Sequence, residues 1–224
     1  LAAATTNCRW DSMLAKFSAD CRLCPRLAEF LDEVKIRHPD YHARPVPAFG
    51  DASPRLLIIG LAPGMHGANR TGRPFTGDFA GILLYQTLHK FGLASKDESI
   101  STDDGLRLTG CRITNAVKCL PPENKPEPGE IRQCNGYLTA EIEGFAKEGG
   151  TALLALGTVA HKAALMALGL KLTAYPFGHG AVHPLSNGVT LYDSYHCSRY
   201  NTQTKRLTAA MFEAVFEKIC ANLS

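Results

Sequence analysis

The chain has 224 residues, of which 45% are hydrophobic and 20% are charged, proportions that are ordinary for a folded soluble protein. No apolar run approaches the ~20 residues that a membrane-spanning helix needs, and the first residues lack the basic and apolar stretches of a secretory signal, so we expect neither. The net charge of +3 is compatible with a nucleic-acid partner but does not indicate one, because it does not say where the charges lie.

The predicted elements alternate along the chain. Apolar residues at helical spacing predict helices at 13–17 and 28–35, and a loop rich in proline and histidine follows at 37–50. Four apolar runs then predict buried strands, each followed by a helix. The strands are expected at Leu56–Gly60, Cys111–Val117, Ala152–Leu156 and Gly188–Tyr195. The helices are expected at Gly81–Phe91, Glu130–Lys147, Thr158–Leu168 and roughly Arg206–Cys220.

This alternation of strands and helices predicts an α/β fold, with helices on both faces of a parallel sheet, because parallel strands need crossover connections. We expect one domain over residues 1–224. In such sheets, sites form beyond the carboxyl ends of the strands. Polar clusters follow three predicted strands, at Gly60–Asp78, Asn115–Cys119 and His196–Ser198, so the fold itself predicts a shared site.

The eight cysteines favour a thiol or metal role over disulfides, because a chain of this size with no export signal does not need them. Cys21 and Cys24 form a C-x2-C pair, Cys119 follows a predicted strand, and Cys134 lies fifteen residues further on. These four predict a four-thiolate site for zinc or an iron–sulfur cluster, which the spacing does not distinguish. The alternative is four separate buried thiols. The remaining cysteines are interpreted as bystanders: Cys8, Cys111, Cys197 and Cys220.

The segment Gly60–Asp78 is rich in glycine and follows a predicted strand, as phosphate-binding loops do. It matches neither the Walker pattern nor the dinucleotide-binding pattern. Its glycines permit tight turns and close backbone approach, and Arg70 and Arg73 add positive charge. Taken alone, Asp78 is expected to cap the following helix and the arginines to be solvated loop charges.

Three segments, in this order and with the four cysteines, resemble the uracil-DNA glycosylase superfamily: GLAPGMHGANRTGRPFTGDFAG, TNAVKCLPPENKPEP and HCSRYN. Within it they resemble the iron–sulfur enzymes of family 5, or type B. The resemblance runs from Cys21 to the last helix and implies a three-layer α/β/α sandwich on a four-stranded parallel sheet. It also implies a [4Fe–4S] cluster that ties the N-terminal helical segment 1–50 to the domain. Its ligands would be Cys21, Cys24, Cys119 and Cys134.

One departure from the pattern is visible after the first strand. The best-known members of the superfamily carry an acidic or amide residue there to handle water, whereas this chain has the apolar sequence Leu61-Ala62-Pro63. The family 5 enzymes that the chain resembles also lack an acidic or amide residue at this place. It moves the catalytic burden to other residues, and it predicts a pocket that accepts bases beyond uracil.

The resemblance implies a monofunctional DNA-repair glycosylase. It would flip uracil and related deaminated or oxidised bases out of double-stranded DNA and hydrolyse the N-glycosidic bond, leaving an abasic site. His196 is expected to stabilise the departing uracil anion, Asn115 to read the base edge, and Asp78 to orient water or face the cationic sugar. Lys118 is not expected to act as a Schiff-base nucleophile.

Contacts to the substrate are expected from the ends of the same segments. The backbone of the first strand end should line the pocket, and Phe75 should stack on the base or pack in the core. Ser198 and Arg73 should hold phosphates. Arg199 and Tyr200 are candidates for the wedge that fills the space left by the flipped base. The full expected set is Gly60, Leu61, Ala62, Gly64, Phe75, Asn115, Arg73, Ser198, Arg199, Tyr200 and Asn201.

The expected partner is double-stranded DNA containing a damaged base, bound by a monomer in the cytoplasm, associated with the nucleoid in a prokaryote. Two other functions stay open. One is a zinc-stabilised nucleic-acid binding module without catalysis. The other is a nucleotide or phosphate-ester hydrolase that uses the glycine loop as an anion cradle. The second would need a divalent metal, and no D-x-D or H-x-H pair follows a predicted strand.

Overall fold

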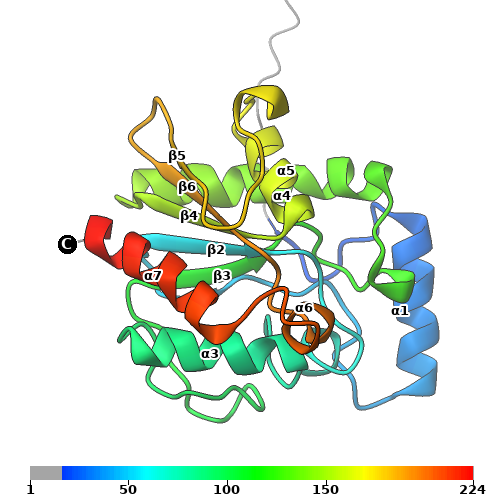
Figure 1. Ribbon diagram of the computed structural model, residues 1–224. Coiled ribbons are helices and arrows are strands. Elements are labelled where there is room, and N and C mark those ends of the chain that lie inside the picture. Colours follow the sequence, from blue (N-terminus) through cyan, green and yellow to red (C-terminus); the bar gives the residue numbers. More distant parts are fainter. Residues whose placement is uncertain (1–16, 224) are drawn as a thin grey trace, which may run out of the picture.

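The computed structural model describes residues 17–223, and a six-stranded β-sheet with helices on both faces forms its centre (Figure 1). The strand order is β1-β3-β2-β4-β6-β5. The four central strands are parallel to one another: β3 (Cys111–Asn115), β2 (Leu56–Gly60), β4 (Ala152–Leu156) and β6 (Thr190–Ser194). Two short antiparallel strands, β1 (Phe49–Gly50) and β5 (Val182–Pro184), form the edges.

The number of strands in the sheet was therefore underestimated. The sequence predicts four strands, whereas the sheet has six, because each edge strand is only two or three residues long and leaves no recognisable alternation. The class itself, an α/β fold with helices on both sides of the sheet, is as predicted.

Burial on both faces explains the sequences of the central strands. β2 reads LLIIG and β4 reads ALLAL, and every residue of both is buried, as in strands that are covered above and below. Leu56 and Ile58 contribute to the hydrophobic core on one face of the sheet, and Leu57 and Ile59 contribute to the core on the opposite face. Leu56 pairs with Cys111 on one side and with Ala152 on the other, so the carboxyl ends of these strands lie level.

Helices α3 (Phe79–Lys90) and α7 (Ala209–Leu223) cover one face of the sheet, and α4 (Pro128–Lys147) and α5 (Thr158–Ala167) cover the other (Figure 1). α7 begins three residues later than predicted, where Thr208 Oγ1 accepts a hydrogen bond from the Met211 N–H. Four short helices were not predicted, since each has too few residues to show a period. They are α2 (Ala68–Thr71), η1 (Pro122–Asn124), η2 (Leu172–Ala174) and α6 (Arg199–Gln203).

Helix α1 (Pro25–Arg37) stands at one end of the sheet (Figure 1). It begins at Pro25, because proline suits the first helical position, and so it is longer than the predicted 28–35. Arg26 makes two hydrogen bonds of 2.8 Å to Glu130 and thereby joins α1 to α4. The helix predicted at 13–17 lies outside the described residues except for Phe17. None of the helices between residues 17 and 223 has the length and apolar character to cross a membrane.

Candidate active site and cysteine site

A cavity of about 560 Å³ opens at the carboxyl ends of β2, β3, β4 and β6. Polar clusters after three of these strands meet there, as expected for a parallel sheet. The predicted residues that line the cavity are Leu61, Ala62, Gly64, Phe75, Asp78, Asn115, His196, Ser198, Arg199 and Asn201. The structure therefore brings most of the predicted site residues to one place.

His196 follows β6 and faces this cavity. The residue as a whole is partly exposed. Burial lowers the pKa of His196 to about 4, because the charged imidazolium would lose its hydration. The ring is consequently neutral at physiological pH and carries one N–H donor and one acceptor. The side chain of Asn201 donates a 2.8 Å hydrogen bond to the backbone carbonyl of His196, which holds this turn in place.

Asn115 ends β3 and is 2% exposed. Its Oδ1 is buried and accepts no hydrogen bond from any described residue. A buried acceptor without a partner costs free energy, and the residue that carries it is part of the cavity wall. Gly60 makes room for this side chain, because a Cβ at Gly60 would lie 2.4 Å from Asn115 Oδ1 and 2.7 Å from Phe75 Cζ.

Phe75 lies against the site rather than in a distant part of the core. Its ring lines the cavity and stacks on His196, with the ring centroids 5.9 Å apart and the planes 27° apart. Its φ of 55° is a left-handed conformation that costs a non-glycine residue ~1–2 kcal/mol. Strain of this kind persists where the surrounding structure requires a particular side-chain position.

Asp78 performs the capping role and also lines the cavity. Its Oδ1 accepts a 2.8 Å hydrogen bond from the Gly81 N–H at the start of α3. Its Oδ2 lies toward Gly64 and Gly67, and of these two glycines Gly64 lines the cavity. Burial raises the pKa of the Asp78 carboxyl, and the backbone N–H groups at the helix start partly offset that effect. The helix cap uses one carboxylate oxygen, so the second oxygen can contact a bound molecule.

The segment after His196 forms the short helix α6. Ser198 is its N-cap, with Oγ accepting a hydrogen bond from the Asn201 N–H, and Ser198 also lines the cavity. The Arg199 guanidinium lies over the Phe79 ring, 5.0 Å from its centroid, at the cavity mouth. Tyr200 points outward and is 69% exposed.

The expectation that Arg73 binds phosphate is not supported by its position. Arg73 is 4% exposed, and its guanidinium donates hydrogen bonds to Asp104, Ser99 and Thr76. It also lies over the Phe49 ring, 4.8 Å from the centroid. A guanidinium that is buried and paired in this way holds the glycine loop together, and it is not available to a DNA backbone.

Sequence reasoning missed about half of the cavity wall. The missed residues are Ala68, Ala80, Asn124, Leu156, Gly157, Thr158, Val159, Phe177, Tyr195 and Arg206. Residues 156–159 lie at the carboxyl end of the parallel strand β4, so the strand-end rule applies to them, although none of them carries a charged or amide side chain that signals chemistry. Phe177 comes from a loop and Asn124 from the segment between Cys119 and Cys134, and no local pattern marks either.

The four predicted metal-ligating cysteines meet at a second place, beside α1. Cys21, Cys24, Cys119 and Cys134 line one small cavity, and none of them forms a disulfide. The Lys118 N–H donates a hydrogen bond to Cys134 Sγ at 3.3 Å. Burial raises the pKa of Cys119 to about 12 and that of Cys134 to about 11. Thiolates at this place therefore need a bound cation, and the four sulfurs suit one.

Comparison with known proteins assigns the chain to a family. The sequence model of the uracil DNA glycosylase superfamily matches residues 47–220. The chain belongs to the uracil DNA glycosylase superfamily. It is 52% identical over 197 residues to the type-5 uracil-DNA glycosylase of Thermus thermophilus, covering 86% of this chain and 89% of that protein.

Other members of the superfamily match at lower identity. The type-5 uracil-DNA glycosylase of Pyrobaculum aerophilum is 39% identical over 217 residues, covering 95% of this chain and 93% of that protein. A type-4 uracil-DNA glycosylase of the same organism is 34% identical over 130 residues, 58% of this chain and 57% of that protein. The chain is thus more similar to these type-5 proteins than to that type-4 protein, in agreement with the resemblance of its motifs.

Proposed function

We propose that this chain is a monofunctional DNA glycosylase that hydrolyses the bond between deoxyribose and uracil in double-stranded DNA. The observation that carries the proposal is a cavity whose wall contains both Asn115, which has an unpartnered Oδ1, and the neutral side chain of His196. Membership of the superfamily, and the names of its relatives, support it.

Recognition of the base follows from the groups on the cavity wall. Uracil presents an N–H donor between two carbonyl acceptors, and the Asn115 amide offers the matching acceptor and donor. The buried Oδ1 would receive its missing hydrogen bond from that N–H. Phe75 provides an apolar surface for the ring of the base. A base in a duplex reaches such a pocket only by being flipped out of the stack, at a cost of a few kcal/mol.

Bond cleavage places negative charge on the departing base and positive charge on the sugar. His196 is neutral, so it donates an N–H hydrogen bond to a carbonyl oxygen of the base and stabilises the anion as it forms. Asp78 supplies the opposite charge for the sugar and an acceptor for the attacking water. The electron pair of the broken bond leaves with the base, and the water oxygen bonds to the sugar carbon. The proton that the water loses passes to Asp78 and from there to the departed base or to solvent.

Lys118 does not supply an amine nucleophile. Its side chain is 1% exposed, and its Nζ bonds both oxygens of Glu141, at 2.9 Å and 2.7 Å, as well as Thr114 Oγ1. An ammonium group held in this way, away from the cavity, supports water as the nucleophile and hence a monofunctional enzyme.

For the cysteine site we propose a [4Fe–4S] cluster bound by Cys21, Cys24, Cys119 and Cys134. Four thiols that share one cavity, two of them buried and two partly exposed, with a backbone N–H aimed at one sulfur, fit such a group. The cluster would act as a structural tie. It would fasten α1 to α4 and hold the loop that brings Asn124 to the active-site cavity. Four iron atoms per chain and absorbance near ~400 nm are the expected signature; a colourless protein with one zinc would contradict it.

The function is tested by measuring base release in EDTA. Duplex oligonucleotides carrying uracil, hypoxanthine, xanthine or hydroxymethyluracil are incubated with the protein, and abasic sites are then cleaved with alkali. We expect cleavage at uracil, and at some of the other bases because the pocket wall at Leu61 and Ala62 is apolar. A His196→Ala preparation made in the same way controls for contaminating glycosylase. Binding of the uracil duplex without base release would instead support a non-catalytic module.

A further inference from the structure

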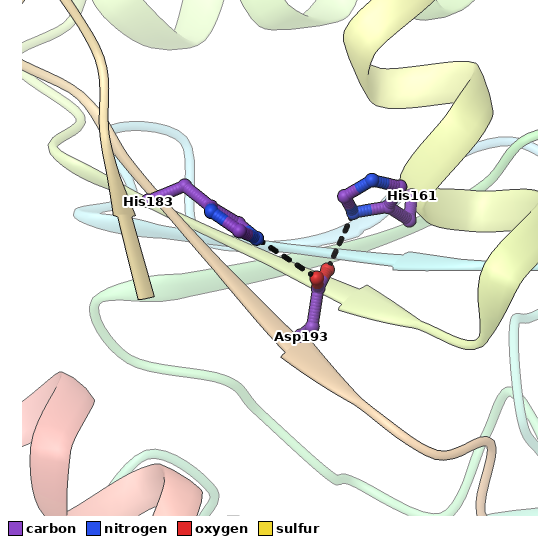
Figure 2. Close-up of side chains that lie close together, drawn as sticks. All are labelled: His161, His183 and Asp193. Atoms are coloured by element: carbon purple, nitrogen blue, oxygen red, sulfur yellow. Dashed lines mark hydrogen bonds and ion pairs between the residues drawn. The ribbon is translucent and has the colours of Figure 1, made fainter. Parts of the chain in front are cut away.

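We propose that His161, His183 and Asp193 form a site for one divalent cation of the zinc class, apart from both the active-site cavity and the cysteine site. The three residues come from α5, β5 and β6, and one ligand atom of each lies within 4.8 Å of the others. Figure 2 shows the Asp193 carboxylate between the two imidazole rings, with one oxygen toward each. The distances are 2.8 Å from Oδ1 to His161 Nδ1 and 3.2 Å from Oδ2 to His183 Nε2.

The hydrogen bonding of His161 requires a proton or a metal ion between its ring and Asp193. His161 Nε2 lies 2.9 Å from the Tyr175 carbonyl oxygen, which can only accept, so Nε2 carries the hydrogen. In a neutral ring, Nδ1 then presents a lone pair to a carboxylate oxygen 2.8 Å away. Two lone pairs repel at that distance. Either a proton or a metal ion must therefore lie between His161 and Asp193.

The third residue favours the metal ion. A proton joins two atoms and leaves His183 with a separate, longer contact, whereas one metal ion joins all three side chains. Zinc bonds to nitrogen and oxygen are about 2.0–2.2 Å, which places tetrahedral ligands about 3.3 Å apart, so the 2.8 Å contact would open by about half an ångström. A metal-bound histidine commonly donates its other N–H to a backbone carbonyl, as His161 does to Tyr175.

The burial of Asp193 and the partial exposure of His183 also fit a metal site. The Asp193 side chain is 0% exposed, so its charge needs compensation from within the protein. The His183 side chain is 12% exposed, so the cluster is accessible to solvent from this side.

The cation would fasten a segment that forms part of the active-site wall. Tyr175 and His183 bound this segment, and both belong to the cluster or its hydrogen bonds. Between them, Phe177 packs edge-on against the His161 ring, with centroids 5.5 Å apart, and also lines the cavity. A bound cation would hold the segment on α5 and β6.

Zinc binding to the purified protein with its cysteine site loaded tests the proposal. We would measure metal content by mass spectrometry and zinc affinity by competition with a chromophoric chelator, for wild type and His183→Gln. Glutamine keeps a donor for Asp193 but removes the imidazole ligand. His89→Gln is the control, because His89 is an exposed histidine on α3, outside the cluster, whose Nδ1 lies 3.0 Å from the Ala94 carbonyl oxygen.

We expect one zinc per chain in wild type and His89→Gln, and an affinity at least ~100-fold weaker in His183→Gln. Zinc should also raise the melting temperature of the first two proteins and not of the third. Equal zinc affinity in wild type and His183→Gln would overturn the proposal, as would anomalous diffraction at the zinc edge that places the ion only among the cysteines. Either result would assign a proton to the His161–Asp193 contact. These measurements use no DNA, so their result does not depend on whether the protein is a glycosylase.

Discussion

Gly60 and Gly67 show, at the scale of single residues, what the glycine-rich loop is for. A Cβ at Gly60 would meet Asn115 Oδ1 at 2.4 Å, and a Cβ at Gly67 would meet the Asp78 side chain at 2.4 Å. Both glycines are therefore required by contacts with the protein's own polar side chains. The loop lets these side chains approach the backbone and face the cavity, which agrees with the general use of glycine where a close approach is needed.

Replacing His196 tests its role in stabilising the departing base. His196→Ala should lower the single-turnover rate on a uracil duplex by ~10²-fold or more, because the donor to the base anion is lost. His89→Gln, which alters a histidine away from the cavity, should retain the wild-type rate. A His196→Ala rate within a few-fold of wild type would remove the imidazole from the mechanism.

The two roles of Asp78 can be separated by two substitutions. Asp78→Asn keeps a good N-cap for α3, so its stability should stay close to wild type, whereas Asp78→Ala should lose ~0.5–2 kcal/mol. Both should lose turnover on uracil by at least ~10-fold if the second carboxylate oxygen acts on the sugar or the water. Chemical denaturation and single-turnover kinetics on both variants measure this. Full activity in Asp78→Asn would show that Asp78 is only a cap.

At the scale of elements, α1 depends on other parts of the chain for its position. It is held by the Arg26–Glu130 ion pair, by a small hydrophobic cluster, and by the cysteine site, to which Cys21 and Cys24 contribute. The other two cysteines of this site come from the main domain: Cys119 lies in the loop after β3, and Cys134 lies in the first half of α4. Loss of the proposed cluster should therefore loosen α1 before it affects the sheet.

Cys134→Ala tests this dependence. The iron content should fall from about four atoms per chain toward zero, and amide exchange in Pro25–Arg37 should accelerate while β2 and β4 stay protected. Hydrogen-exchange mass spectrometry measures both regions in one experiment. Cys220→Ala on α7, outside the cysteine cavity, is the control. Unchanged exchange in α1 after loss of iron would show that the metal group does not hold this helix.

At the scale of the whole molecule, the sequence predicts the strands that have a continuous apolar run and the site at their carboxyl ends. It does not predict positions that depend on contacts between residues far apart in the chain. The bounds of β2 and β4 match their apolar runs, and the strand-end rule places Asn115 and His196 at one cavity. Arg73 was misplaced because its partner Asp104 lies in a different loop, and local sequence does not show an ion pair of that kind. Phe177 was missed because its position depends on tertiary contacts of its loop.

The buried neutral state of His196 also affects the stability of the whole protein. The pKa of His196 is lowered from 6.5 to about 4 on folding, so the unfolded chain binds the extra proton first as pH falls. The contribution of the buried neutral imidazole to the free energy of unfolding is fully present above the unfolded pKa. It is lost progressively as pH falls from about 6.5 toward 4. Relative to wild type, His196→Gln should therefore gain stability between pH 7 and pH 5 in urea denaturation. A stability difference that does not change with pH would contradict the low pKa.

The most direct test of the active-site assignment is a crystal structure of Asp78→Asn bound to a uracil-containing duplex. The account predicts that the uracil is flipped into the cavity, with its N–H donating to Asn115 Oδ1 and a carbonyl oxygen within hydrogen-bond distance of the His196 ring. A uracil that occupies a different pocket, or one that enters this cavity without contacting Asn115 and His196, would contradict it.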